Sequence, residues 1–191
     1  MELLSIASGS SGNCYYIGNE ETHLLVDAGV SGKKIETALN EIDRKPSDLN
    51  GILVTHEHID HVKGLGVMAR KHGIPIYTTG GTISEIKKMS SVGTIDDSLF
   101  HEIEPDEPFF INDLSIDASA IWHDAADPVC YSISDGKSKF SIATDMGNFD
   151  DYVVNKLKNS DIMVIEANHD IRMLQAGPYP YYLKQRILGN R

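Results

Sequence analysis

Apolar residues in the first part of the chain form short segments separated by turn residues. Three such segments cover Glu2–Ala7, Cys14–Gly18 and His23–Asp27. A turn rich in serine and glycine, Ser8–Asn13, separates the first two segments. This pattern predicts three strands that open a sheet as a meander. Over Lys33–Ile42 the apolar residues recur at helical spacing, which predicts an amphipathic helix lying on that sheet.

The rest of the chain continues as short strands and helices. The apolar run Gly51–Thr55 predicts a strand, and the helical pattern of Val62–His72 follows it. Further strands are predicted at Ile76–Thr79, Phe109–Ile111, Leu114–Ile121, Val129–Ser134, Lys139–Thr144 and Ile162–Glu166. Further helices are predicted at Gly81–Met89, Asp151–Asn159 and Tyr182–Leu188. Strand-rich segments punctuated by helices predict an α/β protein in which helices cover sheets.

Length and composition favour a single domain over residues 1–191. The chain is 41% hydrophobic and 24% charged, as in an ordinary globular protein. It contains no apolar stretch long enough to cross a bilayer and no signal-peptide pattern at Met1. Two cysteines, Cys14 and Cys130, are too few for a disulfide framework, and each lies in an apolar run. We therefore expect buried free thiols, no membrane partner and a cytoplasmic location.

The charge balance bears on nucleic-acid binding. The 17 basic and 28 acidic residues give a formal net charge of −11. This balance argues against a protein that binds nucleic acid through bulk positive charge. It does not exclude a nuclease, because divalent cations bound among acidic residues would reverse the sign of the local field.

Three of the eight histidines fall within six residues, His56–His61, together with Asp60. In an extended strand end, residues two apart point the same way, so His56 and His58 can converge on one cation. Where the chain turns into the next helix, Asp60 and His61 can address a second cation. Imidazoles and carboxylates suit Zn²⁺, Mn²⁺ or Fe²⁺, and the lack of a nearby cysteine argues against a closed structural zinc site. A solvated polar turn is the weaker interpretation of this spacing.

The pattern His56-x-His58-x-Asp60-His61 after an apolar strand, with Leu24-Leu25-Val26-Asp27-Ala28-Gly29 upstream, resembles the signature of the metallo-β-lactamase superfamily. The resemblance implies an αββα four-layer sandwich, in which two mixed sheets are flanked by helices. It also implies that His123 completes the first metal site and that Asp145 bridges two metals. Asp27 would orient the metal-binding loop through a ligand histidine.

A narrower resemblance is to the YycJ/WalJ-type branch of this superfamily, which is similar to nucleases such as ribonuclease Z. Its motifs here are Ser5-Ile6-Ala7-Ser8-Gly9-Ser10-Ser11-Gly12-Asn13, His123-Asp124-Ala125-Ala126-Asp127-Pro128, Ala143-Thr144-Asp145-Met146-Gly147 and Glu166-Ala167-Asn168-His169-Asp170. The resemblance implies 5′-to-3′ exonuclease action on DNA. Members of the branch usually continue with a Gly-His-Leu-Ser-Asn segment and a last metal-binding histidine. We therefore expect the last part of the domain, and one ligand of the second metal, to be missing here.

The resemblance assigns two divalent metal ions, Zn²⁺ or Mn²⁺, with Fe²⁺ also suitable. The first would be held by His56, His58 and His123, and the second by Asp60 and His61, with Asp145 bridging. Two such cations can lower the pKa of a shared water for attack on phosphorus, so no protein nucleophile is needed. Asp60 is then the side chain expected to accept or steer the water's proton. His169 could contact the scissile phosphate or hold the rim of the site, or it could be a surface loop residue.

Two other functions stay open. The same metals would serve a thioester or ester hydrolase of the glyoxalase II type, because the cluster itself supports many chemistries. A non-catalytic metal-binding module is the third reading, based on the missing terminal histidine. The Ser8–Asn13 loop is expected to be a turn joining two strands rather than a phosphate site. The other histidines, His23, His72 and His101, are interpreted as structural in strand, helix-end and loop contexts.

Overall fold

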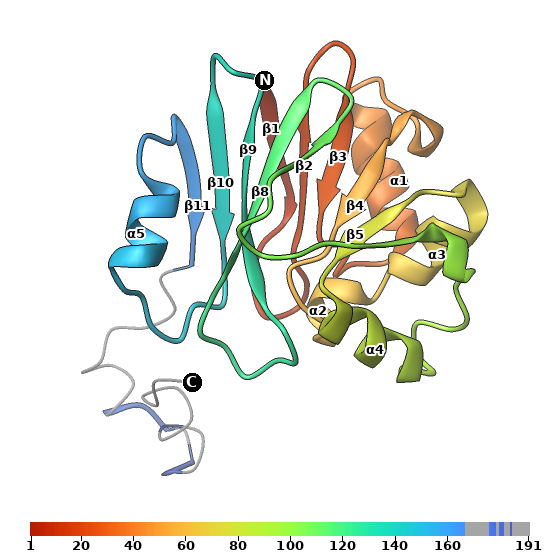
Figure 1. Cartoon of the computed structure of the whole chain (residues 1–191). Coiled ribbons are helices and arrows are strands. Elements are labelled where there is room, and N and C mark those ends of the chain that lie inside the picture. Colours follow the sequence, from red (N-terminus) through yellow and green to blue (C-terminus); the bar gives the residue numbers. More distant parts are fainter. Residues whose placement is uncertain (167–175, 179, 182–183, 185–191) are drawn as a thin grey trace.

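Two β-sheets lie face to face, with helices on the outer face of each (Figure 1). The structure is a computed structural model that describes residues 1–166, 176–178, 180–181 and 184. The layers run helices, sheet, sheet, helix, which confirms the predicted αββα arrangement. Among the described residues, no helix is long and apolar enough to span a membrane.

The first sheet combines an antiparallel meander with parallel strands. Its order is β1-β2-β3-β4-β5-β6, antiparallel from β1 to β3 and parallel from β3 to β6. The meander was predicted from the sequence. The strands are β1 (Glu2–Ala7), β2 (Cys14–Gly18), β3 (His23–Val26), β4 (Gly51–Leu53), β5 (Ile76–Thr78) and β6 (Phe100–Glu102).

The second sheet has the order β11-β10-β9-β8-β7. Its pairs are antiparallel except for β10 with β11, which run parallel and are connected through a helix, α5 (Asp151–Leu157). The strands are β7 (Phe109–Ile111), β8 (Leu114–Ala120), β9 (Val129–Ser134), β10 (Lys139–Ala143) and β11 (Ile162–Ile165). Both sheets therefore contain parallel and antiparallel pairs, as expected for mixed sheets.

The first sheet's outer face carries the remaining helices. These are α1 (Gly32–Glu41), α2 (Ile59–Val62), α3 (Leu65–His72) and α4 (Gly80–Lys88), with 3-10 turns at Pro46–Asp48 and Asp97–Leu99. The predicted single helix Val62–His72 is wrong in its start, because the chain forms the separate turn α2 and then α3. The break falls at Gly64, whose backbone N–H donates to the Ala28 carbonyl at 2.7 Å. A Cβ at Gly64 would collide with the carbonyl oxygen of Val30, so the close crossing requires glycine.

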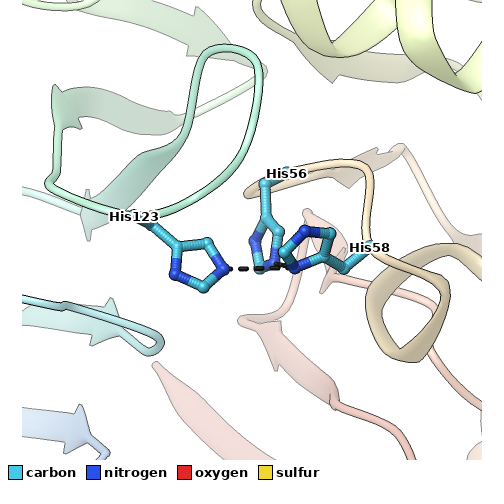
Figure 2. A group of neighbouring side chains, drawn as sticks. All are labelled: His56, His58 and His123. Atoms are coloured by element: carbon cyan, nitrogen blue, oxygen red, sulfur yellow. Dashed lines mark hydrogen bonds between the residues drawn. The ribbon is translucent and has the colours of Figure 1, made fainter. Parts of the chain in front are cut away.

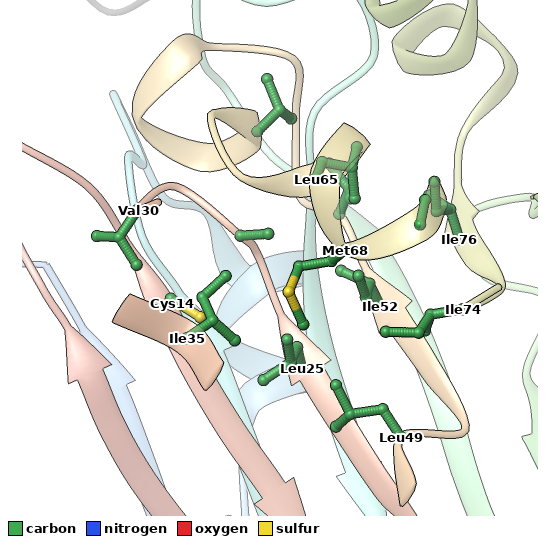
Figure 3. Close-up of a cluster of buried hydrophobic side chains, with 14 of the residues drawn as sticks. Cys14, Leu25, Val30, Ile35, Leu49, Ile52, Leu65, Met68, Ile74 and Ile76 are labelled. Atoms are coloured by element: carbon green, nitrogen blue, oxygen red, sulfur yellow. The ribbon is translucent and has the colours of Figure 1, made fainter. Parts of the chain in front are cut away.

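Three apolar clusters hold the layers together. One lies between the first sheet and its helices and includes Leu25, Ile35 and Met68 (Figure 3). A second fills the space between the sheets, and a third joins the second sheet to α5 through Val153 and Leu157. Each fully buried side chain of this kind contributes about 1.5–3 kcal/mol through the hydrophobic effect. Cys14 and Cys130 are buried and unpaired, as predicted.

Strand β6 was not predicted, and the prediction that His101 lies in a loop is wrong. His101 lies in β6 and stacks on Tyr77, with ring centroids 4.9 Å apart. The other two structural histidines also have local partners. His23 Nδ1 lies 2.8 Å from the Tyr16 hydroxyl, and His72 Nε2 lies 3.0 Å from a Glu36 carboxylate oxygen. The predicted helix Tyr182–Leu188 falls outside the described residues except for Lys184.

Candidate metal centre

The predicted site residues lie where strands of both sheets end. His56 and His58 follow β4, His123 follows β8, and Asp145 follows β10. Asp60 and His61 lie on the short helix α2 that continues from the β4 loop. Several predicted strands were one or two residues too long, at Thr55, Ile121 and Thr144, because the chain leaves the ladder just before it enters the site.

Three histidines face one another (Figure 2). His56 Nε2 lies 3.1 Å from His58 Nδ1, which in turn lies 3.2 Å from His123 Nε2. Three imidazole nitrogens bound tetrahedrally to one zinc ion would lie about 3.3 Å apart, given Zn–N bonds of about 2.0–2.1 Å. The nitrogen spacing therefore fits a single cation held by these three residues, which form one of two compact ligand groups among the described residues.

The second compact group consists of His56, His61 and Asp145. His61 Nε2 lies 3.1 Å from Asp145 Oδ2 and 3.7 Å from Asp60 Oδ2. Asp145 Oδ2 is buried and accepts no hydrogen bond from the described residues. Its near neighbour is the His61 Nε2 atom, which is itself a possible metal ligand. The donor set of two imidazoles and one carboxylate therefore fits a second cation, while Asp60 lies at the edge of the group.

Asp27 fixes the orientation of His61. It is fully buried, follows β3 and adopts a left-handed backbone conformation with φ of 60°. Its carboxylate accepts from the Thr55 backbone N–H at 2.8 Å and from the Thr55 hydroxyl, and its Oδ2 lies 2.8 Å from His61 Nδ1. The His61 Nδ1–H is therefore engaged, and Nε2 faces the second group. This is the orienting role that the resemblance predicted for Asp27.

Backbone hydrogen bonds clamp the helix α2 from two sides. The Asn13 N–H donates to the Asp60 carbonyl at 2.7 Å, and the Ala28 N–H donates to the His61 carbonyl at 2.8 Å. The two clamping loops are joined to each other, because the Gly29 N–H donates to the Asn13 carbonyl at 2.8 Å. The Ser8–Asn13 loop thus joins β1 and β2, as predicted, and also supports the site. Asn13, whose side-chain nitrogen lies 3.1 Å from His61 Nε2, was missed.

Two carboxylates accept backbone hydrogen bonds from the loops that the second sheet contributes to the site. Glu57 Oε1 accepts from the Ala126 N–H at 2.9 Å, which connects the histidine cluster to the loop after His123. Glu166 accepts from the Asp145 N–H at 2.7 Å. No role was predicted for Glu57, although its position inside the histidine cluster was a signal. Asp145, like Asp27, has a left-handed backbone with φ of 59°.

Burial and charge shift the titration of the site residues. Burial, aided by the neighbouring histidines, lowers the pKa of His56 to about 2. Burial also acts to lower the pKa of His61, but Asp27 and Asp145 outweigh it and raise that pKa to about 10. Burial would raise the pKa of Asp145, yet contact with His61 holds it below its usual range. His56 is therefore neutral near pH 7, the form that can ligate a cation.

His169, the remaining predicted site residue, lies outside the described residues. The site thus contains six of the seven residues predicted for catalysis or metal binding. Five of them, His56, His58, His61, His123 and Asp145, fall in the two compact groups. Asp60 is adjacent, with a side chain 28% exposed.

Comparison with known proteins gives the family. A family profile described as "Beta-lactamase superfamily domain" matches residues 22–179, and the chain belongs to this superfamily. Within it, the chain is 42% identical to "Exodeoxyribonuclease WalJ" of Streptococcus pneumoniae and 38% identical to "Exodeoxyribonuclease YycJ" of Bacillus anthracis. Each match covers 97% of this chain and 69% of the relative. The YycJ/WalJ branch predicted from the motifs is therefore confirmed.

Solved structures agree on the fold. Zn²⁺-bound PqqB from Methylobacterium extorquens superposes with a TM-score of 0.71 at 16% identity, covering 88% of this chain and 64% of PqqB. The metallo-β-lactamase fold protein YhfI from Bacillus subtilis gives a TM-score of 0.68 at 17% identity, covering 87% of this chain and 71% of YhfI. The chain thus spans less than two thirds of PqqB. The metallo-β-lactamase fold predicted from the sequence is confirmed.

Proposed function

We propose that this chain is a metal-dependent exodeoxyribonuclease that hydrolyses DNA from the 5′ end. The observation that carries the proposal is the pair of ligand groups that share His56 and lie where strands of both sheets end. The names of the two relatives support DNA as the substrate. A cytoplasmic location is part of the proposal and is supported by the two unpaired cysteines.

In this proposal His56, His58 and His123 hold one divalent cation. His61 and Asp145 would hold a second cation, with Asp60 beside it, and Asp145 is the residue that the family resemblance assigns as a shared ligand. Zn²⁺ and Mn²⁺ suit these ligands, and Fe²⁺ does also. Two such cations supply a lowered water pKa and neutralise charge that develops on the phosphoryl oxygens.

The chain's own residues orient the ligands and accept a proton. Asp27 keeps the Nδ1–H of His61 engaged, so that Nε2 stays directed at the site. Asp60, whose partly exposed carboxylate lies 3.7 Å from His61 Nε2, accepts the proton of the attacking water. The mechanism requires no protein nucleophile. The two cysteines could not serve as one at neutral pH, because burial raises the pKa of Cys14 and that of Cys130, the latter to about 12.

The test is degradation of a DNA duplex by the 191-residue chain with Mn²⁺, using strands labelled at either end. We expect labelled mononucleotides from the 5′-labelled strand at the earliest times. The matched control is Asp145→Asn, since asparagine tolerates the left-handed backbone at this position while losing the charge. Loss of activity in the control would assign the activity to this site. Intact DNA beside hydrolysis of a model thioester would contradict the nuclease proposal and favour the glyoxalase II-type function.

A further inference from the structure

Two large aromatic side chains are exposed beside the metal centre. Trp122, which directly precedes His123, is 56% exposed. Phe149, which lies four positions after Asp145, is 68% exposed. Single exposed apolar residues are common, but two aromatic rings in the two loops that carry site residues are a more specific arrangement.

The backbone brings these two loops together. Trp122 and Asn148 form an isolated antiparallel bridge, and the Gly147 N–H donates to the Trp122 carbonyl at 2.7 Å. The main chain of Trp122 is therefore fixed relative to the loop that carries Phe149, whereas both rings remain accessible. The bridge joins the same two loops that supply His123 and Asp145, so the backbone segments that carry the two exposed rings border the site.

We propose that Trp122, with Phe149, forms a stacking surface for the bases at a single-stranded DNA end whose phosphate lies at the metal centre. This inference rests on the proposed nuclease function and adds a substrate-positioning role to it. Aromatic side chains bind single strands by stacking on bases, which is largely independent of sequence. An exonuclease needs that tolerance, because it must accept each successive base.

The charge of the chain favours stacking over a basic groove. With a net charge of −11, the chain has little attraction for phosphates away from bound cations. Stacking does not depend on that charge, because every base offers a π-face. Aromatic contact at the rim would therefore provide the affinity that phosphate contacts cannot.

Trp122 is the only tryptophan in the chain, so its fluorescence reports on this position alone. The probe is a short oligothymidine with phosphorothioate linkages, which resists hydrolysis, carrying a fluorescein label at its 3′ end. Zn²⁺ is the metal, because it does not quench fluorescence. Binding is followed by the anisotropy of the label, and stacking by quenching of Trp122.

Two substitutions separate stacking from general apolar contact. Trp122→Phe keeps a π-face, whereas Trp122→Leu keeps an apolar side chain without one. The matched control is Phe110→Leu, since Phe110 is 71% exposed in β7 and pairs with Ser115 near the start of β8, away from its His123 end. Both positions are exposed, so the fold should be preserved in all three variants.

We expect DNA to quench Trp122 in the unmodified chain. Trp122→Leu should weaken binding about tenfold, Trp122→Phe much less, and Phe110→Leu not at all. Unchanged affinity in Trp122→Leu, or binding without quenching, would overturn the stacking surface and leave the nuclease proposal standing. Quenching or a spectral shift with protein concentration alone would assign the rings to contact between copies of the chain and overturn the inference. No DNA binding by the unmodified chain would overturn both proposals.

Discussion

The two sheets contribute to the candidate metal centre in different ways. From the first sheet, the site residues come as one short run, His56–His61, whose helix is clamped by backbone hydrogen bonds from two loops. From the second sheet they come singly, as His123 and Asp145, from two separate loops. These loops are held by individual contacts, such as those of Glu57 with Ala126 and Glu166 with Asp145.

The two halves of the site, one from each sheet, differ in how completely their side chains are buried. In the first half, Asp27 and His61 are fully buried, so almost any change leaves an unpaired polar group or a steric clash. In the second half the side chains of Asp145 and His123 are 19% and 13% exposed, and water can replace a lost partner. We therefore expect substitutions in the first half to affect folding as well as metal binding, and those in the second half to affect mainly metal binding.

The largest effect should come from Gly29→Ala. A Cβ at Gly29 would overlap the Asp60 carbonyl oxygen and crowd the Asn13 nitrogen, both of which belong to backbone. Backbone cannot move aside as a flexible side chain can, so we expect a loss of at least about 3 kcal/mol in the free energy of unfolding. Urea unfolding measures it. The control is Gly73→Ala, where nothing lies within 4 Å and only the left-handed φ of 65° opposes alanine, at about 1–2 kcal/mol. Equal losses in the two variants would refute the clash.

Asp27→Asn should have the next largest effect. Asparagine has one acceptor oxygen for three donors, the Thr55 N–H and hydroxyl and the His61 Nδ1–H. The unmade hydrogen bond should cost about 1–3 kcal/mol. Metal affinity at the second group should fall about 10- to 100-fold, as measured by competition with a chelating dye. The control is Glu36→Gln, which alters another carboxylate–histidine contact, with His72, but lies away from the site. Unchanged metal affinity in Asp27→Asn would show that Asp27 does not orient His61.

The same contact predicts a pH dependence for the metal-free chain. The pKa of His61 is raised from 6.5 to about 10, so its stabilising charge is fully present below pH 6.5 and is lost as the pH rises toward 10. The pKa of His56 is lowered to about 2, so its burial costs stability as the pH falls below 6.5. Melting temperatures measured with chelator should therefore peak near pH 6.5. In Asp27→Asn the decline above that pH should flatten, and a decline of unchanged steepness would contradict the assignment.

The smallest effect should come from Glu57→Ala. It removes the acceptor of the Ala126 N–H in a partly exposed position, which should cost about 1 kcal/mol. Because Ala126 belongs to the loop that follows His123, the three-histidine group should bind metal more weakly while the other group changes less. Glu57→Gln keeps an acceptor oxygen and should behave like the unmodified chain. Identical metal affinities for the alanine and glutamine variants would exclude Glu57 as a positioning residue.

The first sheet supplies its site residues as one run and the second sheet supplies them singly, and this difference decided which of them the sequence could predict. The run His56–His61 could be interpreted from spacing alone, because residues close in sequence must be close in space. His123 and Asp145 are distant along the chain, and only the resemblance to a family placed them. Asn13 and Glu57 act on backbone groups of other segments, and a residue pattern does not identify such partners, although Glu57 lies inside the histidine cluster.

Elements of the fold were likewise predictable where a local pattern specifies them. Segments with clear periodicity, such as the meander and α1, were predicted to within one or two residues. The strand β6 was missed because Phe100–Glu102 is short and largely exposed, with no alternating pattern. The break between α2 and α3 was missed because it depends on the crossing of Gly64 over another loop, which is a tertiary constraint rather than a local one.

The most direct test of a metal centre built by both sheets is the number of metal ions per chain. The purified chain is dialysed to equilibrium against Zn²⁺ or Mn²⁺, and metal is measured by mass spectrometry beside Asp145→Asn. We expect two ions per chain in the unmodified protein, and one in the variant, which keeps the three histidines. One ion or none in the unmodified protein, or the same number in both, would contradict the two-metal centre.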